Sequence, residues 1–210
     1  MKLDGLRNAC KTVFLMIIGF NAVGQEKVTE RYPDQSIKSS GEVLNDRKHG
    51  EWRFYYPSGT LMAIEHYESG ALHGKVSYYF PEGALSGVEN WLDGMLEDSA
   101  KYFFPNGQIE RRGVYRASQY HGQWIHYFEN GEVERVVNYR DGLPHGKFRQ
   151  YNDRGILLQE GEYRNGIEHG YWKFFDEEGD PTYEGAYENG ERAGTWYRYD
   201  RRGRKKEWKY

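Results

Sequence analysis

Cysteine is nearly absent from this chain of 210 residues, and the one that is present, Cys10, lies close to the N-terminus. It falls within a segment that we expect to be removed, so the mature chain would have no thiol. A chain without thiols forms no disulfides, has no cysteine nucleophile and offers no thiolate to a metal ion. Its stability must therefore come from packing alone.

Long hydrophobic runs are also missing. The longest, TVFLMIIGF at residues 12–20, is too short to span a bilayer. It follows a basic start and precedes the small-residue sequence AVG at residues 22–24, which is the layout of a secretory signal peptide. We predict that residues 1–24 are a leader cleaved after Gly24. The mature chain, with no transmembrane segment, would then be exported to the periplasm or the extracellular space.

The chain lacks a strong charge of either sign, since its formal net charge is −3. Such a mild acidic excess gives no electrostatic reason to bind nucleic acid, and we expect no nucleic-acid partner. Aromatic residues, in contrast, make up 17% of the chain, whereas disordered chains contain few of them. The chain is therefore expected to fold, with rings, mainly of tyrosine, as its apolar surface.

A repeat of 24 residues takes up almost all of the remaining sequence. Residues 25–48 are a degenerate copy, in which Tyr32 and Pro33 match Tyr56 and Pro57 one period later. Atypical terminal repeats are typical of caps, so we interpret residues 25–48 as an N-terminal capping repeat and residues 49–210 as the repeats proper. Seven frames, the last one truncated, follow each other without insertion or deletion and begin at His49, His73, Glu97, His121, His145, His169 and Ala193.

Positions 7 and 11 of the frame have the same kind of residue in every frame and, together with position 9, predict a β-hairpin. Position 9 is proline in the first three frames, and proline followed two places later by glycine fits a type I turn that ends in a left-handed residue. This turn places position 7 opposite position 13, which is mostly aliphatic. Position 7 is always aromatic, at Tyr55, Tyr79, Phe103, Tyr127, Tyr151, Phe175 and Tyr199. Position 11 is always glycine, at Gly59, Gly83, Gly107, Gly131, Gly155, Gly179 and Gly203.

The second half of the frame predicts another strand and another turn. Position 19 is aromatic and has the same parity as position 13, so we expect both on one face. Position 22 is usually glycine, often as Asn-Gly or Asp-Gly. No helical period appears. The predicted fold is all-β, a meander of antiparallel β-hairpin repeats in a single elongated, twisted sheet of about fifteen strands.

The motif H-G-x-W-x-x-Y, a turn, and then Y-x-N/D-G resembles the MORN repeat, in the variant of bacterial YwqK-type antitoxins. The resemblance is clearest in the frames that begin at His49, His121 and His169, and it covers residues 49–210. It implies a β-hairpin array that serves as a scaffold for contact with proteins or lipid head groups. The antitoxin relationship implies neutralisation of a partner, although cytosolic antitoxins carry no leader.

Catalytic and metal-binding motifs are not found. Five frames begin with histidine, at His49, His73, His121, His145 and His169. Strands two apart would hold these side chains roughly 10 Å from each other, whereas zinc needs donors about 2 Å away, so we interpret the histidines as turn-packing residues. The sequence has no nucleophile elbow, phosphate-binding loop, HExxH motif or singular carboxylate pair. We expect no catalytic activity, no cofactor and no metal.

The candidate binding surface consists of the tryptophans at position 4, namely Trp52, Trp124, Trp172 and Trp196. Their parity is opposite to that of position 7, so both faces would carry rings unless a bulge at the position 2 glycine resets the pleat. A single-layer sheet would then leave one apolar face partly exposed to a partner.

The leading hypothesis for function is a non-catalytic, exported scaffold in the cell envelope that binds another protein. The alternatives are a module for glycan or lipid head groups and an antitoxin or immunity protein. Two frames depart from the pattern. The frame from Glu97 has Ala100 for tryptophan and Ser118 for the turn glycine, and the frame from His169 has Pro181 at position 13. The basic end, residues 201–206, is interpreted as protection of the sheet edge, with a binding patch as the alternative.

Overall fold

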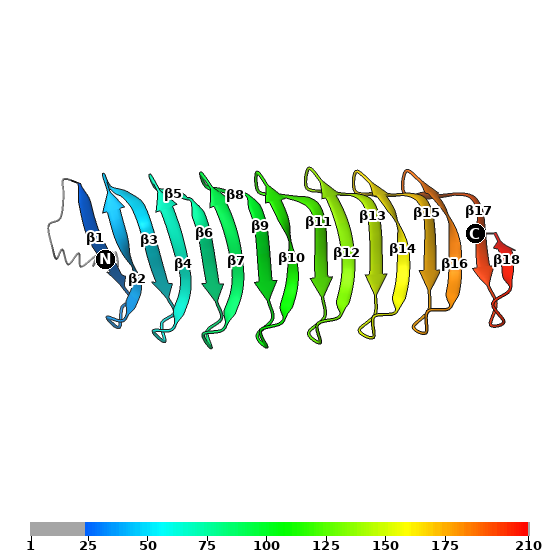
Figure 1. Ribbon diagram of the computed structural model, residues 1–210, viewed down its shortest axis with the longest axis horizontal. Coiled ribbons are helices and arrows are strands. Elements are labelled where there is room, and N and C mark those ends of the chain that lie inside the picture. Colours follow the sequence, from blue (N-terminus) through cyan, green and yellow to red (C-terminus); the bar gives the residue numbers. More distant parts are fainter. Residues whose placement is uncertain (1–23, 210) are drawn as a thin grey trace, which may run out of the picture.

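The computed structural model describes residues 24–209, so all but the last residue of the predicted leader lies outside it. The described residues form strands, with no helix among them (Figure 1). The strands are β1 (Gln25–Arg31), β2 (Ile37–Leu44), β3 (Arg47–Tyr55), β4 (Leu61–Glu68), β5 (Ala71–Leu72), β6 (Gly74–Tyr79), β7 (Leu85–Leu92), β8 (Met95–Leu96), β9 (Asp98–Phe103), β10 (Ile109–Arg116), β11 (Gln119–Tyr127), β12 (Val133–Arg140), β13 (Leu143–Tyr151), β14 (Leu157–Arg164), β15 (Ile167–Phe175), β16 (Pro181–Glu188), β17 (Glu191–Tyr199) and β18 (Lys205–Trp208).

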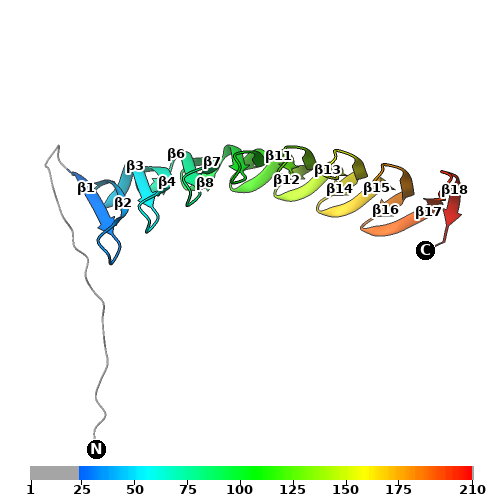
Figure 2. The same ribbon diagram turned by 90° about the horizontal axis from the view of Figure 1, so that it is seen from below.

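The strands form one antiparallel sheet of 18 strands, in which each hairpin pairs with the next along the chain. Two of the strands, β5 and β8, are two-residue pieces that pair with the ends of β4 and β7, and they account for two of the three strands beyond the expected fifteen. The view along the sheet shows a single layer that bends gently from end to end (Figure 2). The all-β meander of hairpin repeats predicted from the sequence is confirmed.

Each frame closes its hairpin with the same three-residue turn. In the first frame the backbone N–H of Gly59 donates to the carbonyl of Tyr56 and that of Tyr56 donates to Thr60, both at 2.8 Å. Tyr55 then lies opposite Leu61, as positions 7 and 13 should. The seven position 11 glycines have φ between 70° and 91°, the left-handed conformation in which a side chain is strained.

The turn at positions 21 and 22 is a two-residue loop with positive φ at both residues, as in Asp141 (51°) and Gly142 (78°). This is the type I′ hairpin turn that Asn-Gly and Asp-Gly favour. It also joins neighbouring repeats, because the N–H of Gly142 donates to the carbonyl of Tyr120 at 3.1 Å. In the frame from Glu97 the same turn is made by Ala117 and Ser118, neither of which is glycine, at 47° and 63°.

Two β-bulges in each of the first six frames decide which side chains share a face. One follows the histidine, where Gly122 and Gly146 have positive φ, and the other falls at position 14, between the residues paired with positions 6 and 7. The second bulge places positions 13 and 19 on opposite faces, which corrects the expected single stripe. Accordingly, the position 19 rings contact tryptophans, as in Tyr163 with Trp172 at 5.2 Å between ring centroids.

We call the two sides the tryptophan face and the open face. The tryptophan face carries positions 4, 6, 15, 17 and 19, and the open face carries positions 3, 5, 7, 13, 16 and 18. In the frame from His145 the tryptophan face holds Phe148, Gln150, Gln159, Gly161 and Tyr163. In the same frame the open face holds Lys147, Arg149, Tyr151, Leu157, Glu160 and Glu162.

The hydrophobic core lies on the tryptophan face. Trp52, Trp124, Trp172 and Trp196 are 2%, 0%, 2% and 1% exposed. This differs from the partly exposed row that their parity suggested, because rings at positions 6, 19 and 24 close over them. Each indole N–H also donates to the carbonyl ten residues earlier, at 2.9 to 3.2 Å. The burial of the tryptophans makes them structural residues.

A glycine eleven residues before each tryptophan makes room for its ring. A Cβ atom on Gly41, Gly113, Gly161 or Gly185 would lie only 2.1 to 2.3 Å from the indole of the next frame. Where position 17 has a side chain, the opposing core residue is smaller than tryptophan: Glu65 precedes Val76, Glu89 precedes Ala100 and Val137 precedes Phe148. A glycine at position 17 therefore goes with tryptophan at position 4, and a larger residue at position 17 goes with a smaller one at position 4, so that the two side chains fill the same space.

Candidate interaction surface

The open face of the C-terminal frames carries charges that pair with each other. The directly opposed residues Arg149, Glu160, Lys173 and Glu184 alternate in sign across β13 to β16. Glu160 forms ion pairs with Arg149 at 3.4 Å and Lys173 at 3.9 Å, and Glu184 pairs with Lys205. Hydrogen bonds from Lys205, Tyr199 and Tyr171 keep the pKa of the buried Glu184 carboxyl low although desolvation opposes them. This part of the face satisfies its own charges.

The central frames leave the same row of the open face without acidic partners. Lys101 on β9 lies directly opposite Arg112 on β10, and no carboxylate of the described residues lies within ion-pair distance of either. The next residues in the row are Ile125 and Val136 on one side and Val88 on the other. The centre of the open face is therefore an apolar strip that contains two neighbouring cations.

The position 7 aromatics border this strip. Tyr79, Phe103 and Tyr127 are half-buried on the open face, opposite Leu85, Ile109 and Val133. The guanidinium of Arg112 lies 5.7 Å from the ring of Tyr127, over its face. Val114, at position 18, is 37% exposed where other frames have a polar residue that hydrogen-bonds the next strand. These rings therefore widen the apolar strip.

The tryptophan face also has a cationic centre, one strand away from the missing tryptophan. Arg111 on β10, His126 on β11 and Arg135 on β12 are directly opposed neighbours. Burial and the two arginines lower the pKa of His126 to about 4, so this imidazole is neutral at pH 7. The row continues into Gln150 and Gln159, which hydrogen-bond each other at 2.6 Å.

A buried carboxylate takes the place of the glycine in front of Ala100. Glu89 is 8% exposed and accepts hydrogen bonds from the Tyr102 hydroxyl at 2.5 Å and the Trp91 indole at 3.0 Å. Burial and the Glu89 carboxylate raise the pKa of Tyr102 well above its usual range. The departure of this frame from the pattern is thus compensated by a polar network.

The histidines at position 1 lie in the turns. His73 and His145 contact the Asp93 and Asn165 side chains of the following type I′ turns, at 3.3 and 3.2 Å. Within residues 24–209 no group of three or more histidine, cysteine, aspartate or glutamate side chains is placed to hold a metal ion. These contacts favour the turn-packing interpretation.

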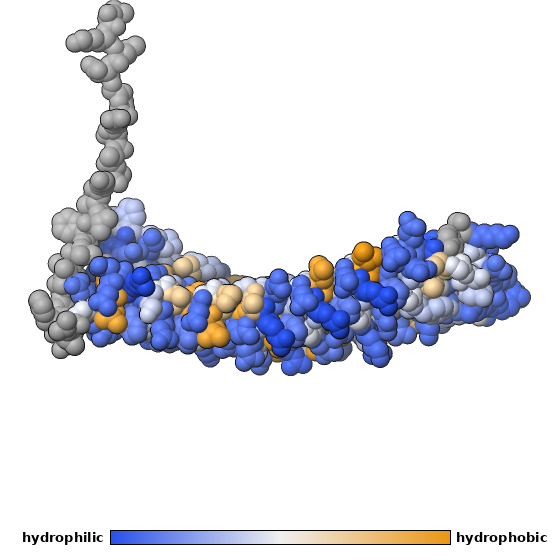
Figure 3. All heavy atoms as spheres, turned by 90° about the horizontal axis from the view of Figure 1, so that it is seen from above, coloured by the Kyte–Doolittle hydropathy of each residue, from blue (hydrophilic) through white to orange (hydrophobic). Residues whose placement is uncertain are grey.

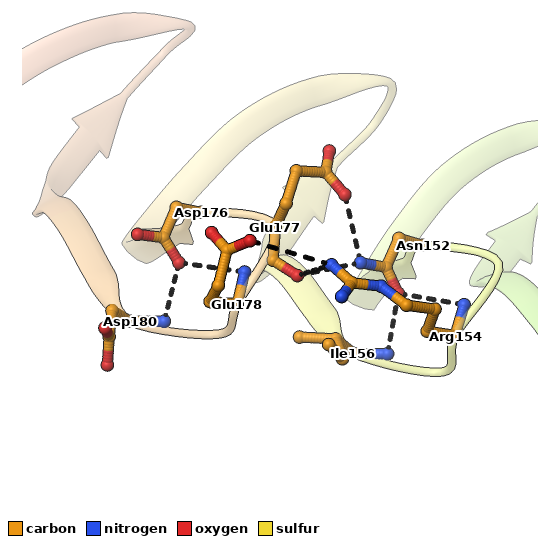
Figure 4. A network of polar contacts seen from close by, with 7 residues as sticks. All are labelled: Asn152, Arg154, Ile156, Asp176, Glu177, Glu178 and Asp180. Atoms are coloured by element: carbon orange, nitrogen blue, oxygen red, sulfur yellow. Dashed lines mark hydrogen bonds and ion pairs between the residues drawn. The ribbon is translucent and has the colours of Figure 1, made fainter.

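A ladder of polar contacts runs along the side of the sheet where the three-residue turns lie. In the C-terminal frames position 8 is Asn152, Asp176 or Asp200, whose side-chain oxygen accepts two backbone N–H groups of its own turn. The amide of Asn152 also donates to the carbonyl of Glu177 in the next repeat, at 3.1 Å (Figure 4). In the frames up to His121, position 8 is aromatic. The three-residue turn is therefore stabilised by side-chain hydrogen bonds from position 8 in the C-terminal frames and has an aromatic residue at that position in the earlier frames.

The opposite edge, with the type I′ turns, carries scattered apolar side chains. Met95, Leu143 and Ile167 are 48%, 50% and 46% exposed. Figure 3 shows separate hydrophobic spots among a mostly hydrophilic surface. Spots of this kind are common on soluble surfaces and do not by themselves indicate a site.

The fold places the protein among those built from an open sheet of β-hairpin repeats. The family model of the MORN repeat variant matches residues 48–69, 99–117, 120–141, 144–165 and 168–189, together about half of the chain. The chain belongs to the MORN repeat variant family. No curated protein matches it. The described residues contain no helix long and apolar enough to cross a membrane.

Solved structures also match, among them one titled "Crystal Structure of TcdB2-TccC3". It is 11% identical, and the match covers 84% of this chain but only 13% of that chain, with a TM-score of 0.19. A likeness of this size carries no argument about function.

Proposed function

We propose that this protein is a non-catalytic, exported scaffold that binds a protein partner through the central part of its open face. The observation that carries the proposal is the contrast along one row of side chains. From Arg149 onward the charges are paired, whereas Lys101 and Arg112 stand unpaired beside Val88, Ile125 and Val136. An apolar strip with two exposed cations fits a partner surface that is apolar and carries carboxylates.

The unpaired cations lower the stability of the isolated chain. Two like charges directly opposed in an antiparallel sheet destabilise it, and no carboxylate of the described residues offsets this at Lys101 and Arg112. A partner carboxylate would remove the repulsion and gain a charge-assisted hydrogen bond. Neutralisation of a toxin, as the resemblance to antitoxins implies, would be a special case that uses the same surface.

Glycan or lipid binding loses the observation that motivated it. It required stripes of tyrosine and tryptophan rings, and the four tryptophan rings are buried. Planar stacking on a sugar needs an accessible ring face, which Trp52, Trp124, Trp172 and Trp196 do not offer in this fold.

The experiment is mild crosslinking of the full chain in its native host, followed by fractionation and mass spectrometry. Wild type is compared with the open-face variant Val88→Ser/Val136→Ser and with the control Ile167→Ser on the turn edge. We expect one reproducible protein partner with wild type and control and its loss with the open-face variant. Retention of that partner by the open-face variant, or no partner at all with wild type, would contradict the proposal.

A further inference from the structure

Arg111, His126 and Arg135 form a row of hydrogen-bond donors on the tryptophan face, opposite to the apolar strip. Arg111 faces Tyr102 on one side and His126 on the other, and His126 faces Arg135. Opposed Cβ atoms in an antiparallel sheet are about 5 Å apart, so the Cβ atoms of the two arginines are spaced by roughly 10 Å, with His126 between them. All three belong to consecutive strands of a rigid sheet.

The two arginines have no acidic partner. No carboxylate of the described residues is within ion-pair distance of Arg111 or Arg135, and the Nε of Arg111 is buried without any hydrogen-bond partner. The guanidinium of Arg111 stacks on the ring of Tyr102, with its carbon 4.2 Å from the ring centroid. Stacking fixes the plane of the group and leaves N–H edges to bind an oxyanion.

The frames on either side of the two central ones lack these cations. At the same pair of positions the neighbouring frames have Tyr78 with Gly87 and Gln150 with Gln159, and the amides of the latter bond each other. A buried, unsatisfied guanidinium nitrogen is costly in a native protein unless a ligand meets it. The position therefore indicates a binding role rather than a contribution to stability.

We propose that Arg111 and Arg135, with His126 between them, bind carboxylates of an extended acidic peptide that crosses the tryptophan face along the axis of the sheet. The linear arrangement favours this ligand over a compact anion, because a phosphate needs donors that converge on one point. In an extended peptide of the polyproline II type, side chains three residues apart lie on the same side at roughly 9 Å from each other, close to the spacing of the two arginines. His126 is neutral at pH 7 and can donate one N–H without adding repulsion.

The probe is poly-L-glutamate, titrated into the full mature chain in 150 mM salt and followed by calorimetry. The chain has a formal net charge of −3, so uniform electrostatics do not favour the interaction. We expect saturable binding that Arg111→Gln/Arg135→Gln weakens at least tenfold. The control Arg116→Gln/Arg164→Gln removes the same charge from exposed strand ends and is expected to change the affinity less than twofold.

Two comparison ligands distinguish the source of the oxyanion. A polyuronate presents carboxylates on a sugar chain, and inorganic phosphate presents a compact anion. Equal or tighter binding of either, an equal loss in the control variant, or no binding of poly-L-glutamate would overturn the proposal. Thermal unfolding of each variant shows whether the fold is intact. Because this site lies on the other face from Val88 and Val136, it can fail while the proposed function stands.

Discussion

The central strands β9 to β12 and the C-terminal strands β13 to β16 share one backbone but use their side chains differently. In the C-terminal strands Glu160 forms ion pairs with Arg149 and Lys173. Glycine–tryptophan pairs and amide contacts between turns occur in both regions, as in Gly113 with Trp124 and Asn130 with the Asp153 carbonyl. In the central strands, Lys101, Arg111, Arg112 and Arg135 have no acidic partner, and Ala100 has replaced a core ring. The difference supports our proposal that the central part of the open face binds a partner, whereas the opposed charges of the C-terminal part are paired within the sheet.

A change in the glycine–tryptophan pairs should have the largest effect. In Gly161→Ala the new Cβ would lie 2.1 Å from the Trp172 ring, so we expect a loss of about 3 kcal/mol or more in the free energy of unfolding. Urea unfolding measures it. Gly87→Ala is the control, because the nearest contact of its Cβ would be a ring carbon of Tyr102 at 3.2 Å.

A compensating double variant tests the same pair, Gly161 and Trp172. Gly161→Val with Trp172→Phe recreates the combination that Val137 and Phe148 make naturally. We expect the double variant to be more stable than Gly161→Val alone. If the two changes were simply additive, the two positions would not share one volume.

The side chain of Asn152 should have the next largest effect. It is 6% exposed, accepts two backbone N–H groups and donates to the next repeat. We expect Asn152→Ala to lower the free energy of unfolding by about 2 kcal/mol, since it leaves buried polar groups unpaired. Asn130→Ala serves as the control, because its side chain also donates to the next repeat, at the Asp153 carbonyl, but accepts only one backbone N–H and lies in an exposed turn; it should cost less. Equal costs would show that burial of the turn is irrelevant.

The central strands should respond to pH through His126. Its folded pKa of about 4 lies below the ordinary value of 6.5, so the unfolded chain binds the proton more readily. The stability that depends on the neutral imidazole is complete above pH 6.5 and is lost as the pH falls toward 4. Between pH 7.5 and 5 we expect wild type to lose about 1 to 2 kcal/mol more than His126→Gln in urea unfolding. Parallel losses would contradict the buried position between Arg111 and Arg135.

The smallest expected effect is a gain in the turn between β10 and β11. Ala117 has a φ of 47°, a left-handed conformation that alanine adopts at a cost and asparagine tolerates. Ala117→Asn should raise the free energy of unfolding by about 0.5 to 1 kcal/mol. A thermal melt detects the shift, and Asn165→Ala in the equivalent turn is expected to move it the other way.

The sequence was sufficient to predict the period, both turns and the meander, because each depends on local features. Glycine at position 11 and Asp-Gly or Asn-Gly at positions 21 and 22 specify φ directly. The assignment of faces was less accurate, since a simple alternation of side chains ignores the bulge at position 14. One extra residue there moved position 19 to the tryptophan face.

The sequence did not predict which residues make up the candidate site, because the assignment of side chains to faces was inaccurate. Tryptophans looked like a binding surface because large rings were assumed to lie on an exposed face. The signal that would have placed them in the core was present, since Gly41, Gly113, Gly161 and Gly185 each precede a tryptophan by eleven residues. The unpaired arginines could not be recognised, because ion pairing depends on the register across strands rather than on composition.

The most direct test of the comparison is urea unfolding of two charge-neutralised variants. Lys101→Gln/Arg112→Gln removes opposed cations from the central open face, and Arg149→Gln/Lys173→Gln removes two cations that Glu160 pairs with. We predict that the midpoint of unfolding stays unchanged or rises for the central variant. It should fall for the C-terminal variant by an amount equivalent to about 0.5 to 1 kcal/mol. A fall in the central variant as large as in the C-terminal one would contradict the view that the central cations are reserved for a partner.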